Sequence, residues 1–158
     1  MTAAVQTLAI APIADADVAD VVALWQTCGL TRPWNDPVAD IALARKGPNS
    51  TILLGREDEK VVASAMVGHD GHRGWVYYVA TDPDRRGQGL GRAIMSAAED
   101  WLRQAGIAKL HLLVRQDNAK ASAFYETIGY DEAAVTVFAK WLDGREQAPQ
   151  LAPPEGQT

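Results

Sequence analysis

The chain has 158 residues and is 47% apolar, which suits one domain with a sizeable core and leaves no room for a second catalytic domain. Fifteen Lys and Arg against twenty Asp and Glu give a net charge of −5, which disfavours nucleic acids and acidic membrane surfaces as partners. The single cysteine excludes an internal disulfide framework, and no His/Cys cluster has zinc-ligand spacing. With no signal-peptide pattern and no apolar run approaching a membrane span, we expect a cytoplasmic protein without a metal site.

The first predicted elements are a short strand and a helix. The apolar run from Leu8 to Ile13 indicates the strand. Asp15 or Asp17 then lies where a carboxylate accepts the first free amides of a helix. The apolar face of that helix covers residues 18–25, and Gly29 is a natural end.

A second helix and a hairpin follow. Asp36 before Pro37 is typical of a helix N-cap with proline at the first helical position. The runs 51–56 and 61–68 are β-branched and apolar, and the charged segment 57–60 joins them, as in an antiparallel hairpin.

The middle of the chain predicts a strand, a glycine-rich turn and a helix. Residues 75–81 form the strand pattern after the polar loop 70–74. The helix presents an apolar face from Ile94 to Ala105 and stops at Gly106.

The last part predicts a strand at 109–115, a helix with its apolar face over 121–128 and a final strand at 136–141. Residues 1–143 would then form one domain, and the Pro- and Gln-rich segment 144–158 a disordered tail. This order of elements predicts an α+β fold with one sheet and helices on both faces.

The turn Arg86-Gly87-Gln88-Gly89-Leu90-Gly91 has the character of an anion site. A helix N-terminus has unpaired amides and a partial positive charge, and glycines let a phosphate approach them closely. Arg85, Arg86 and Arg92 add positive charge in an acidic protein. The same glycines also suit an ordinary strand-to-helix loop.

Two common nucleotide motifs do not fit this turn. G-x-G-x-x-G requires a glycine where Arg92 stands, and G-x-x-x-x-G-K-[ST] does not occur in the chain. A Rossmann or P-loop assignment is therefore disfavoured.

The turn instead resembles the acetyl-CoA motif Q/R-x-x-G-x-G/A of the GNAT-type N-acetyltransferases, which Arg86, Gly89 and Gly91 match. Residues 79–83 resemble that family's strand ending, and residues 118–130 resemble its last-helix signature.

The resemblance covers roughly residues 8–142, and segments 30–37 and 68–74 further resemble the bacterial YpeA-type subgroup. It implies a three-layer α/β/α fold with a mixed, mostly antiparallel sheet and a splayed central strand pair.

The resemblance also implies an acetyl-CoA site. The backbones of Val79 and Thr81 would bond the pantetheine arm between the splayed strands, and the Val79 amide would stabilise the oxyanion of the tetrahedral intermediate. Asn118 would bond the cofactor arm, cap the last helix, or do both. The set implied for the cofactor is Val79, Ala80, Thr81, Arg86, Gly87, Gln88, Gly89, Leu90, Gly91, Arg92, Asn118 and Tyr125.

The resemblance makes Tyr125 the general acid that protonates the leaving thiolate, a role that a phenol can fill. From the residues alone, Tyr125 is a core aromatic on a buried helix face. Two positions where many relatives carry a glutamate hold Trp75 and Leu113, so the general base stays open. The candidates are His69, Asp70, His72, His111 and a water chain to Tyr77.

Trp34, Asn35 and Asp36 lie between the first two helices, in a segment that walls the acceptor site in this family. A helix cap with a packing tryptophan explains the same residues, and for Asp36 we expect the cap. An acidic wall there would suit a cationic amine. The residues expected near the substrate are Trp34, Asn35, Asp36, His69, Asp70 and Tyr77.

These observations predict an enzyme that moves acetyl from acetyl-CoA to a primary amine by direct attack in a ternary complex. The amine would belong to a small molecule, or to a protein N-terminus or lysine, and a ribosomal-protein N-terminal acetyltransferase is one version. The alternative is a non-catalytic acyl-CoA-binding or regulatory module, which the missing glutamates keep open. The sequence leaves a homodimer open and does not identify the acceptor.

Overall fold

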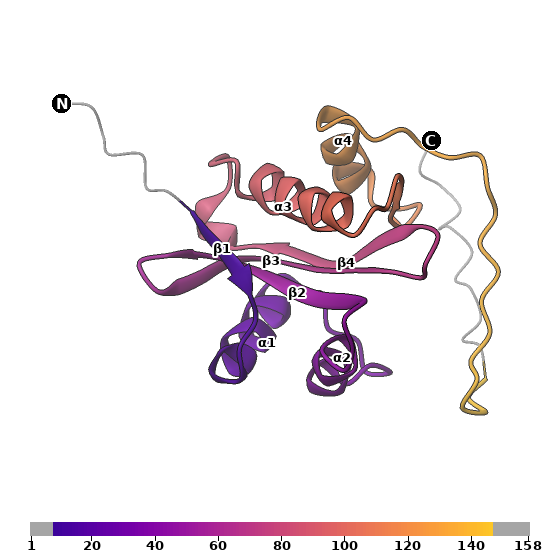
Figure 1. The fold of residues 1–158 in the computed structure, drawn as a ribbon, viewed down its shortest axis with the longest axis horizontal. Coiled ribbons are helices and arrows are strands. Elements are labelled where there is room, and N and C mark those ends of the chain that lie inside the picture. The colour runs from indigo at the N-terminus through magenta and orange to yellow at the C-terminus, as the bar shows by residue number, and fades with distance from the viewer. Residues whose placement is uncertain (1–7, 147–158) are drawn as a thin grey trace. The chain divides into compact units, whose positions relative to one another are not determined.

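The computed structural model describes residues 8–146 (Figure 1). The described residues fall into two compact units that divide after Leu113, and each unit is described separately. The helices and strands are, in chain order, β1 Ala9–Pro12, the 3₁₀ helix η1 Asp15–Asp17, α1 Val18–Thr27, α2 Pro37–Ala44, β2 Ser50–Glu57, β3 Lys60–His69, β4 Gly74–Thr81, the 3₁₀ helix η2 Pro83–Arg85, α3 Leu90–Gln104, β5 Leu110–His111 and α4 Ala119–Thr127.

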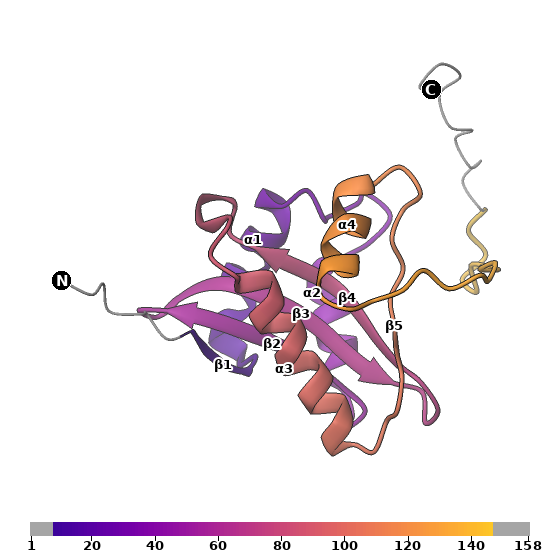
Figure 2. The ribbon, with the colours of Figure 1, turned by 90° about the horizontal axis from the view of Figure 1, so that it is seen from above.

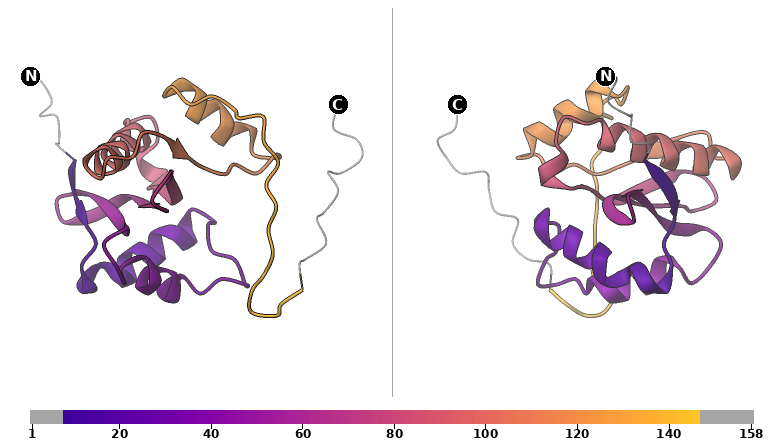
Figure 3. Two further views of the ribbon diagram at one scale, coloured as in Figure 1. Left: turned by 45° about the vertical axis from the view of Figure 1, so that its right-hand side comes forward. Right: turned by 90° about the vertical axis from the view of Figure 1, so that its left-hand side faces the viewer.

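The first unit is a five-stranded sheet in the order β1-β2-β3-β4-β5. The first four strands are antiparallel neighbours, whereas β5 is parallel to β4. Helix α3 covers one face and α1 and α2 cover the other, as Figures 1 and 2 show. Both views of Figure 3 show the same three layers. The predicted α+β class, with its mixed sheet and helices on both faces, is confirmed.

The core of this unit lies on both faces of the central strands. Because helices cover both faces, β2 and β3 carry nearly continuous apolar runs and not a strict alternation. The residues less than 2% exposed include Trp25 of α1, Ile52 and Leu54 of β2, and Ile94 and Met95 of α3.

The hairpin between β2 and β3 is tighter than the predicted four-residue turn. The strands extend through Glu57 and Lys60, which pair with each other, and only Asp58 and Glu59 remain in the loop. Both loop residues have positive φ, 46° and 68°, as in the mirror-image turns whose twist matches that of antiparallel strands.

Of the two helix caps predicted in the N-terminal part, one is confirmed and the other does not form at Asp17. Asp36 caps α2, since its carboxylate accepts the amides of Val38 at 3.0 Å and Ala39 at 3.1 Å. Asp17, however, accepts the amide of Ala14 at 2.8 Å and does not cap α1.

In the second unit, α4 begins at the predicted position. The Asn118 side chain accepts the amide of Ala121 at 3.1 Å, which confirms the cap. The ring of Tyr125 packs edge-on against Phe124 and Tyr130, with centroid distances of 5.1 and 5.9 Å. Gly129 follows the helix with φ 99°, a conformation that glycine adopts without strain.

Two predicted strands are wrong in extent or existence. The strand expected at 109–115 is reduced to Leu110–His111, and no strand forms at 136–141. A β-branched pattern alone does not make a strand, because the backbone of a strand must also hydrogen-bond to the edge of a neighbouring strand. Among the described residues no edge pairs with segment 136–141, where Phe138 is 93% exposed. Most of the predicted tail, residues 147–158, lies outside the described part.

Candidate active site

The glycine-rich turn connects the end of β4 to the start of α3. Gly87 and Gly89 have φ of 78° and 76°, in the left-handed region that strains other residues. A Cβ added at either position would meet no atom within 4 Å. The requirement for glycine is therefore conformational, and the space beside the turn is open.

The backbone amides at the start of α3 fit an anion. The first hydrogen bond of the helix runs from the Ala93 amide to the Gly89 carbonyl at 3.0 Å, and no side chain caps the helix. The amides of Leu90, Gly91 and Arg92 therefore have no acceptor from the helix itself. With the open space beside Gly89, this arrangement suits a phosphate oxygen.

The arginines beside the turn divide into two roles. Arg86 and Arg92 are exposed, and among residues 8–146 neither forms an ion pair. Arg85, expected to add positive charge, is instead neutralised, since its Nη1 lies 2.5 Å from Oε2 of the buried Glu57. Two of the three predicted cations thus remain available to an anion.

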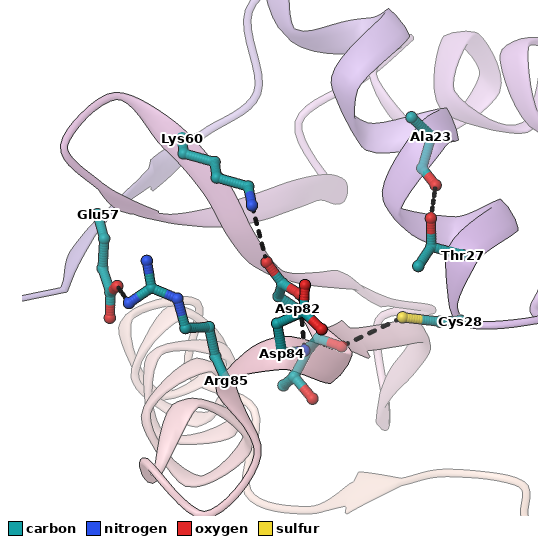
Figure 4. Close-up of polar contacts among 9 residues, drawn as sticks. Ala23, Thr27, Cys28, Glu57, Lys60, Asp82, Asp84 and Arg85 are labelled. Atoms are coloured by element: carbon teal, nitrogen blue, oxygen red, sulfur yellow. Dashed lines mark hydrogen bonds and ion pairs between the residues drawn. The ribbon is translucent and has the colours of Figure 1, made fainter.

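A second ion pair anchors the same turn (Figure 4). Asp82 is buried, accepts the Asp84 amide at 2.9 Å and lies 3.1 Å from Lys60 Nζ. The Asp84 amide and the Lys60 ammonium hold the pKa of the Asp82 carboxyl below its ordinary value. The turn is therefore fixed to the β2–β3 hairpin at two points, Glu57 and Lys60.

The edge of β4 is open along most of its length. β5 pairs with β4 only at Gly74 and Trp75, so among the described residues no strand lies beside the rest of β4 on that edge. The resemblance implies a splayed strand pair at this edge, and β5 indeed accompanies β4 over only two residues, although β5 is shorter than the predicted strand. The register of β4 with β3 also shifts between Tyr77 and Ala80, so that Tyr78 and Val79 have no paired residue in β3.

Two residues that were not predicted from the sequence bear on this part of β4: Tyr78 belongs to the strand, and Cys28 contacts it. Tyr78 has φ 51°, rare for an aromatic residue, and no local sequence signal marks it. The Cys28 thiol donates to the Thr81 carbonyl at 3.2 Å (Figure 4), and burial raises the pKa of this thiol. The Thr81 carbonyl is thus already engaged, which leaves the Thr81 amide as the group to test for the predicted cofactor bond.

The predicted candidates in the β3–β4 loop have structural partners. Asp70 accepts the amides of His72 at 2.9 Å and Arg73 at 2.8 Å and the Trp75 indole at 3.3 Å. These hydrogen bonds lower the pKa of Asp70 to about 2. The Nδ1 atom of His69 accepts the amide of Gly71 at 3.1 Å. The Asp70 carboxylate is therefore ionised and accepts three hydrogen bonds from its own loop and the adjoining strand, which makes it a loop-stabilising residue.

The remaining predicted substrate residues lie on two other elements. Tyr77 of β4 is 47% exposed, and burial of the rest of its side chain raises its pKa. Trp34 is also 47% exposed, in the loop before α2. Next to it, the Asn35 amide donates to the Arg32 carbonyl at 3.0 Å. The His111 ring lies edge-on to Trp75 at 5.0 Å, and no carboxylate occupies the Trp75 or Leu113 position.

Tyr125 and Asn118 belong to the second unit, which is described by itself. Burial raises the pKa of the Tyr125 phenol, which keeps the proton that a general acid must donate. The roles of both residues toward acetyl-CoA remain predictions.

Comparisons with known proteins agree with this geometry. The model of the acetyltransferase (GNAT) family matches residues 18–130. This chain belongs to the GNAT family. An acetyltransferase of Pectobacterium atrosepticum is 37% identical over 131 residues, which cover 82% of this chain and 93% of the relative. A Yersinia pestis acetyltransferase is 37% identical over 126 residues, which cover 80% of this chain and 89% of the relative.

Solved structures of GNAT enzymes share the fold. The ribosomal-protein-S18-alanine N-acetyltransferase of Escherichia coli superposes with a TM-score of 0.68 at 28% identity, covering 80% of this chain and 79% of that one. An aminoglycoside N-acetyltransferase in complex with CoA has a TM-score of 0.74 at 13% identity, covering 86% and 95%. The second likeness concerns the fold alone.

Family membership makes the chain an acyl-CoA-dependent N-acyltransferase of the acetyltransferase class, and the GNAT family uses acetyl-CoA. The described residues include no helix with the length and apolar character needed to cross a bilayer.

Proposed function

We propose that this enzyme transfers acetyl from acetyl-CoA to a primary amine by direct attack in a ternary complex. The observation that carries the proposal is that the unpaired edge of β4 and the free amides at the start of α3 follow one another along the chain. The open edge of β4 leads directly into the turn where the amides of Leu90 to Arg92 have no helical acceptor. An extended arm ending in a diphosphate matches that arrangement.

The cofactor roles follow from this placement. The amides at residues 89–92, with Arg86 and Arg92, would bind the pyrophosphate. The backbone of Val79, beside the bulge, would bond the pantetheine arm and place an amide at the thioester oxygen as charge develops there. The support is the position of Val79 outside both strand registers.

Proton transfer would use Tyr125 as the general acid. The pKa of a phenol raised by burial keeps it protonated at neutral pH, so it can give its proton to the departing thiolate. The acceptor amine must lose a proton, and neither family glutamate position supplies a carboxylate. A water chain that ends at Tyr77 or at a loop histidine is therefore the proposed route.

The acceptor is a primary amine on a small molecule or on a protein N-terminus or lysine. Peptides beginning with alanine belong first in a test panel, because the Escherichia coli enzyme named for S18 alanine shares 28% identity with this chain. Aminoglycosides and small amines complete the panel. A cytoplasmic location, a homodimer and the YpeA-type subgroup stay predictions.

The test incubates the protein with acetyl-CoA and this amine panel and measures the released thiol. Amine-dependent release that falls in Tyr125→Phe supports the proposal. The absence of amine-dependent release across the panel would favour a CoA-binding module in its place. Calorimetry with CoA on Gly89→Glu tests the pyrophosphate site separately, since bulk and negative charge there should abolish binding.

A further inference from the structure

Tyr78 holds a backbone conformation that a bulky residue rarely adopts. Its φ of 51° lies in the left-handed region, at the place where the pairing of β3 with β4 shifts between Ser64 and Met66. Such a conformation persists when surrounding contacts over-determine it, and it often marks a functional position.

Three elements hold Tyr78 at three different points. The Ser64 hydroxyl of β3 donates to the Tyr78 carbonyl at 3.0 Å. The Trp25 ring of α1 stacks on the Tyr78 ring at 3.8 Å and 7°. The Tyr78 hydroxyl donates to Asp40 Oδ2 of α2 at 2.7 Å. Carbonyl, ring and hydroxyl are all fixed, so the residue has little freedom to rotate.

The contacts also support each other. The Trp25 indole donates to the Ser64 hydroxyl at 2.9 Å, and both of these residues are fully buried. Trp25 and Ser64 therefore form a rigid base for the ring and carbonyl of Tyr78. Asp40 lies in the first turn of α2 and is only partly exposed. It is the one member of the group that belongs to α2, the helix that follows the predicted acceptor loop.

We propose that Asp40 is a positioning residue for acyl transfer, which holds Tyr78 in its left-handed conformation and thereby aims the Val79 backbone at the thioester. This inference rests on the proposed function and deepens it. Asp40 acts through Tyr78, because the Tyr78 hydroxyl donates to the Asp40 carboxylate. It also links α2 to the oxyanion-binding edge of β4, so the acceptor side and the acyl side of the site are mechanically connected.

The test compares Asp40→Ala, Asp40→Asn and Tyr78→Phe. Alanine removes the acceptor of the Tyr78 hydroxyl, whereas the asparagine side-chain oxygen still accepts it. We expect kcat to fall ~10- to 100-fold in Asp40→Ala and Tyr78→Phe, the range for a misplaced reacting group, and to recover to within about threefold in Asp40→Asn. Acetyl-CoA affinity should fall less than kcat, since the Val79 backbone is displaced while the pyrophosphate site at the glycine turn is unaltered.

Asp15→Asn is the control, because Asp15 also contacts the end of α2, through Arg45 at 2.7 Å, and is not among the residues that hydrogen-bond or stack with Tyr78 in the described part of the chain. Its kcat should match that of the unsubstituted protein. Unchanged kcat in Asp40→Ala would overturn the inference. So would an Asp40→Asn variant as slow as Asp40→Ala with a limb of the pH profile lost, since Asp40 would then be a base.

A readout without turnover separates this inference from the proposed function. Hydrogen exchange of the unliganded protein over residues 76–82 should be faster in Asp40→Ala than in Asp40→Asn, with the α3 segment 94–104 unchanged. Equal exchange over 76–82 would refute the positioning role. If the unsubstituted protein acetylates no amine in the panel, the proposed function fails, while the exchange comparison still decides the role of Asp40.

Discussion

Gly89 and Gly106 flank α3 and form a matched pair for testing the anion site. Both have left-handed backbones, with φ of 76° and 80°, and a Cβ added to either would meet no atom within 4 Å. Gly89 is the N-cap, beside the open amides, whereas Gly106 follows the C-terminal end. The same substitution therefore produces the same backbone strain at two sites, only one of which is proposed to bind phosphate.

The expected magnitudes follow from that symmetry. Alanine in the left-handed region costs about 1–2 kcal/mol, so both Gly89→Ala and Gly106→Ala should lose a similar free energy of unfolding. For a chain of this size each kcal/mol lowers Tm by roughly 2–4 °C. CoA affinity should fall about ten- to a hundredfold in Gly89→Ala alone, because a hydrogen bond to a charged group contributes ~1.5–3 kcal/mol.

Thermal unfolding and CoA titration calorimetry on the two variants check both magnitudes. Similar Tm shifts with a selective loss of affinity at Gly89 support the anion site. If the two variants lose affinity equally, the effect comes from general destabilisation of α3, and if neither loses it, the pyrophosphate does not bind at this turn. Either result would refute the reasoning.

Three further outcomes are expected. Gly74→Ala should unfold about 1–3 kcal/mol more easily, because its Cβ would lie 2.8 Å from Cδ2 of Leu102, and Leu102→Ala should relieve part of that clash in a double-mutant cycle followed by urea unfolding. Glu57→Gln should lose about 1–3 kcal/mol and weaken CoA binding, while Lys60→Gln, whose side chain is 64% exposed, should lose less than about 1 kcal/mol, as measured by the same unfolding and by calorimetry. Burial raises the pKa of Tyr125, so the phenol stays neutral below about pH 10 and loses its proton only as the pH rises through the higher folded-state pKa. We therefore expect kcat to show no tyrosine-dependent fall below about pH 10. A fall near neutral pH that disappears in Tyr125→Phe would contradict this expectation.

The features that the sequence predicts well are those with local causes. Asp36 before Pro37 and Asn118 before α4 each cap the helix that immediately follows, through an amide two or three residues away. The left-handed backbone of the turn favours glycine at the positions of Gly87 and Gly89 themselves. Because each signal lies beside its effect, spacing along the chain is enough to find it.

The features that the sequence analysis misses or places wrongly depend on distant partners. Glu57 neutralises Arg85 from 28 positions away, and Asp40 reaches Tyr78 from 38 positions away. Segment 136–141 has a strand pattern, yet a strand requires an edge in register, which a pattern cannot supply. Nothing adjacent to these residues in the sequence indicates the partner.

This division follows the two halves of the proposed reaction. The pyrophosphate half depends on backbone amides and glycines, so a short motif encodes it and relatives at low identity can share it. The acyl and acceptor half is proposed to depend on Tyr78, around which side chains of α1, α2 and β3 meet in contacts that no short motif records. Family resemblance therefore transfers the cofactor more securely than the acceptor. The acceptor is better sought by varying Trp34 and Asn35 of the predicted acceptor loop, which are not among the residues described around Tyr78, while the cofactor is held constant, since a change in amine preference would then report on the acceptor side.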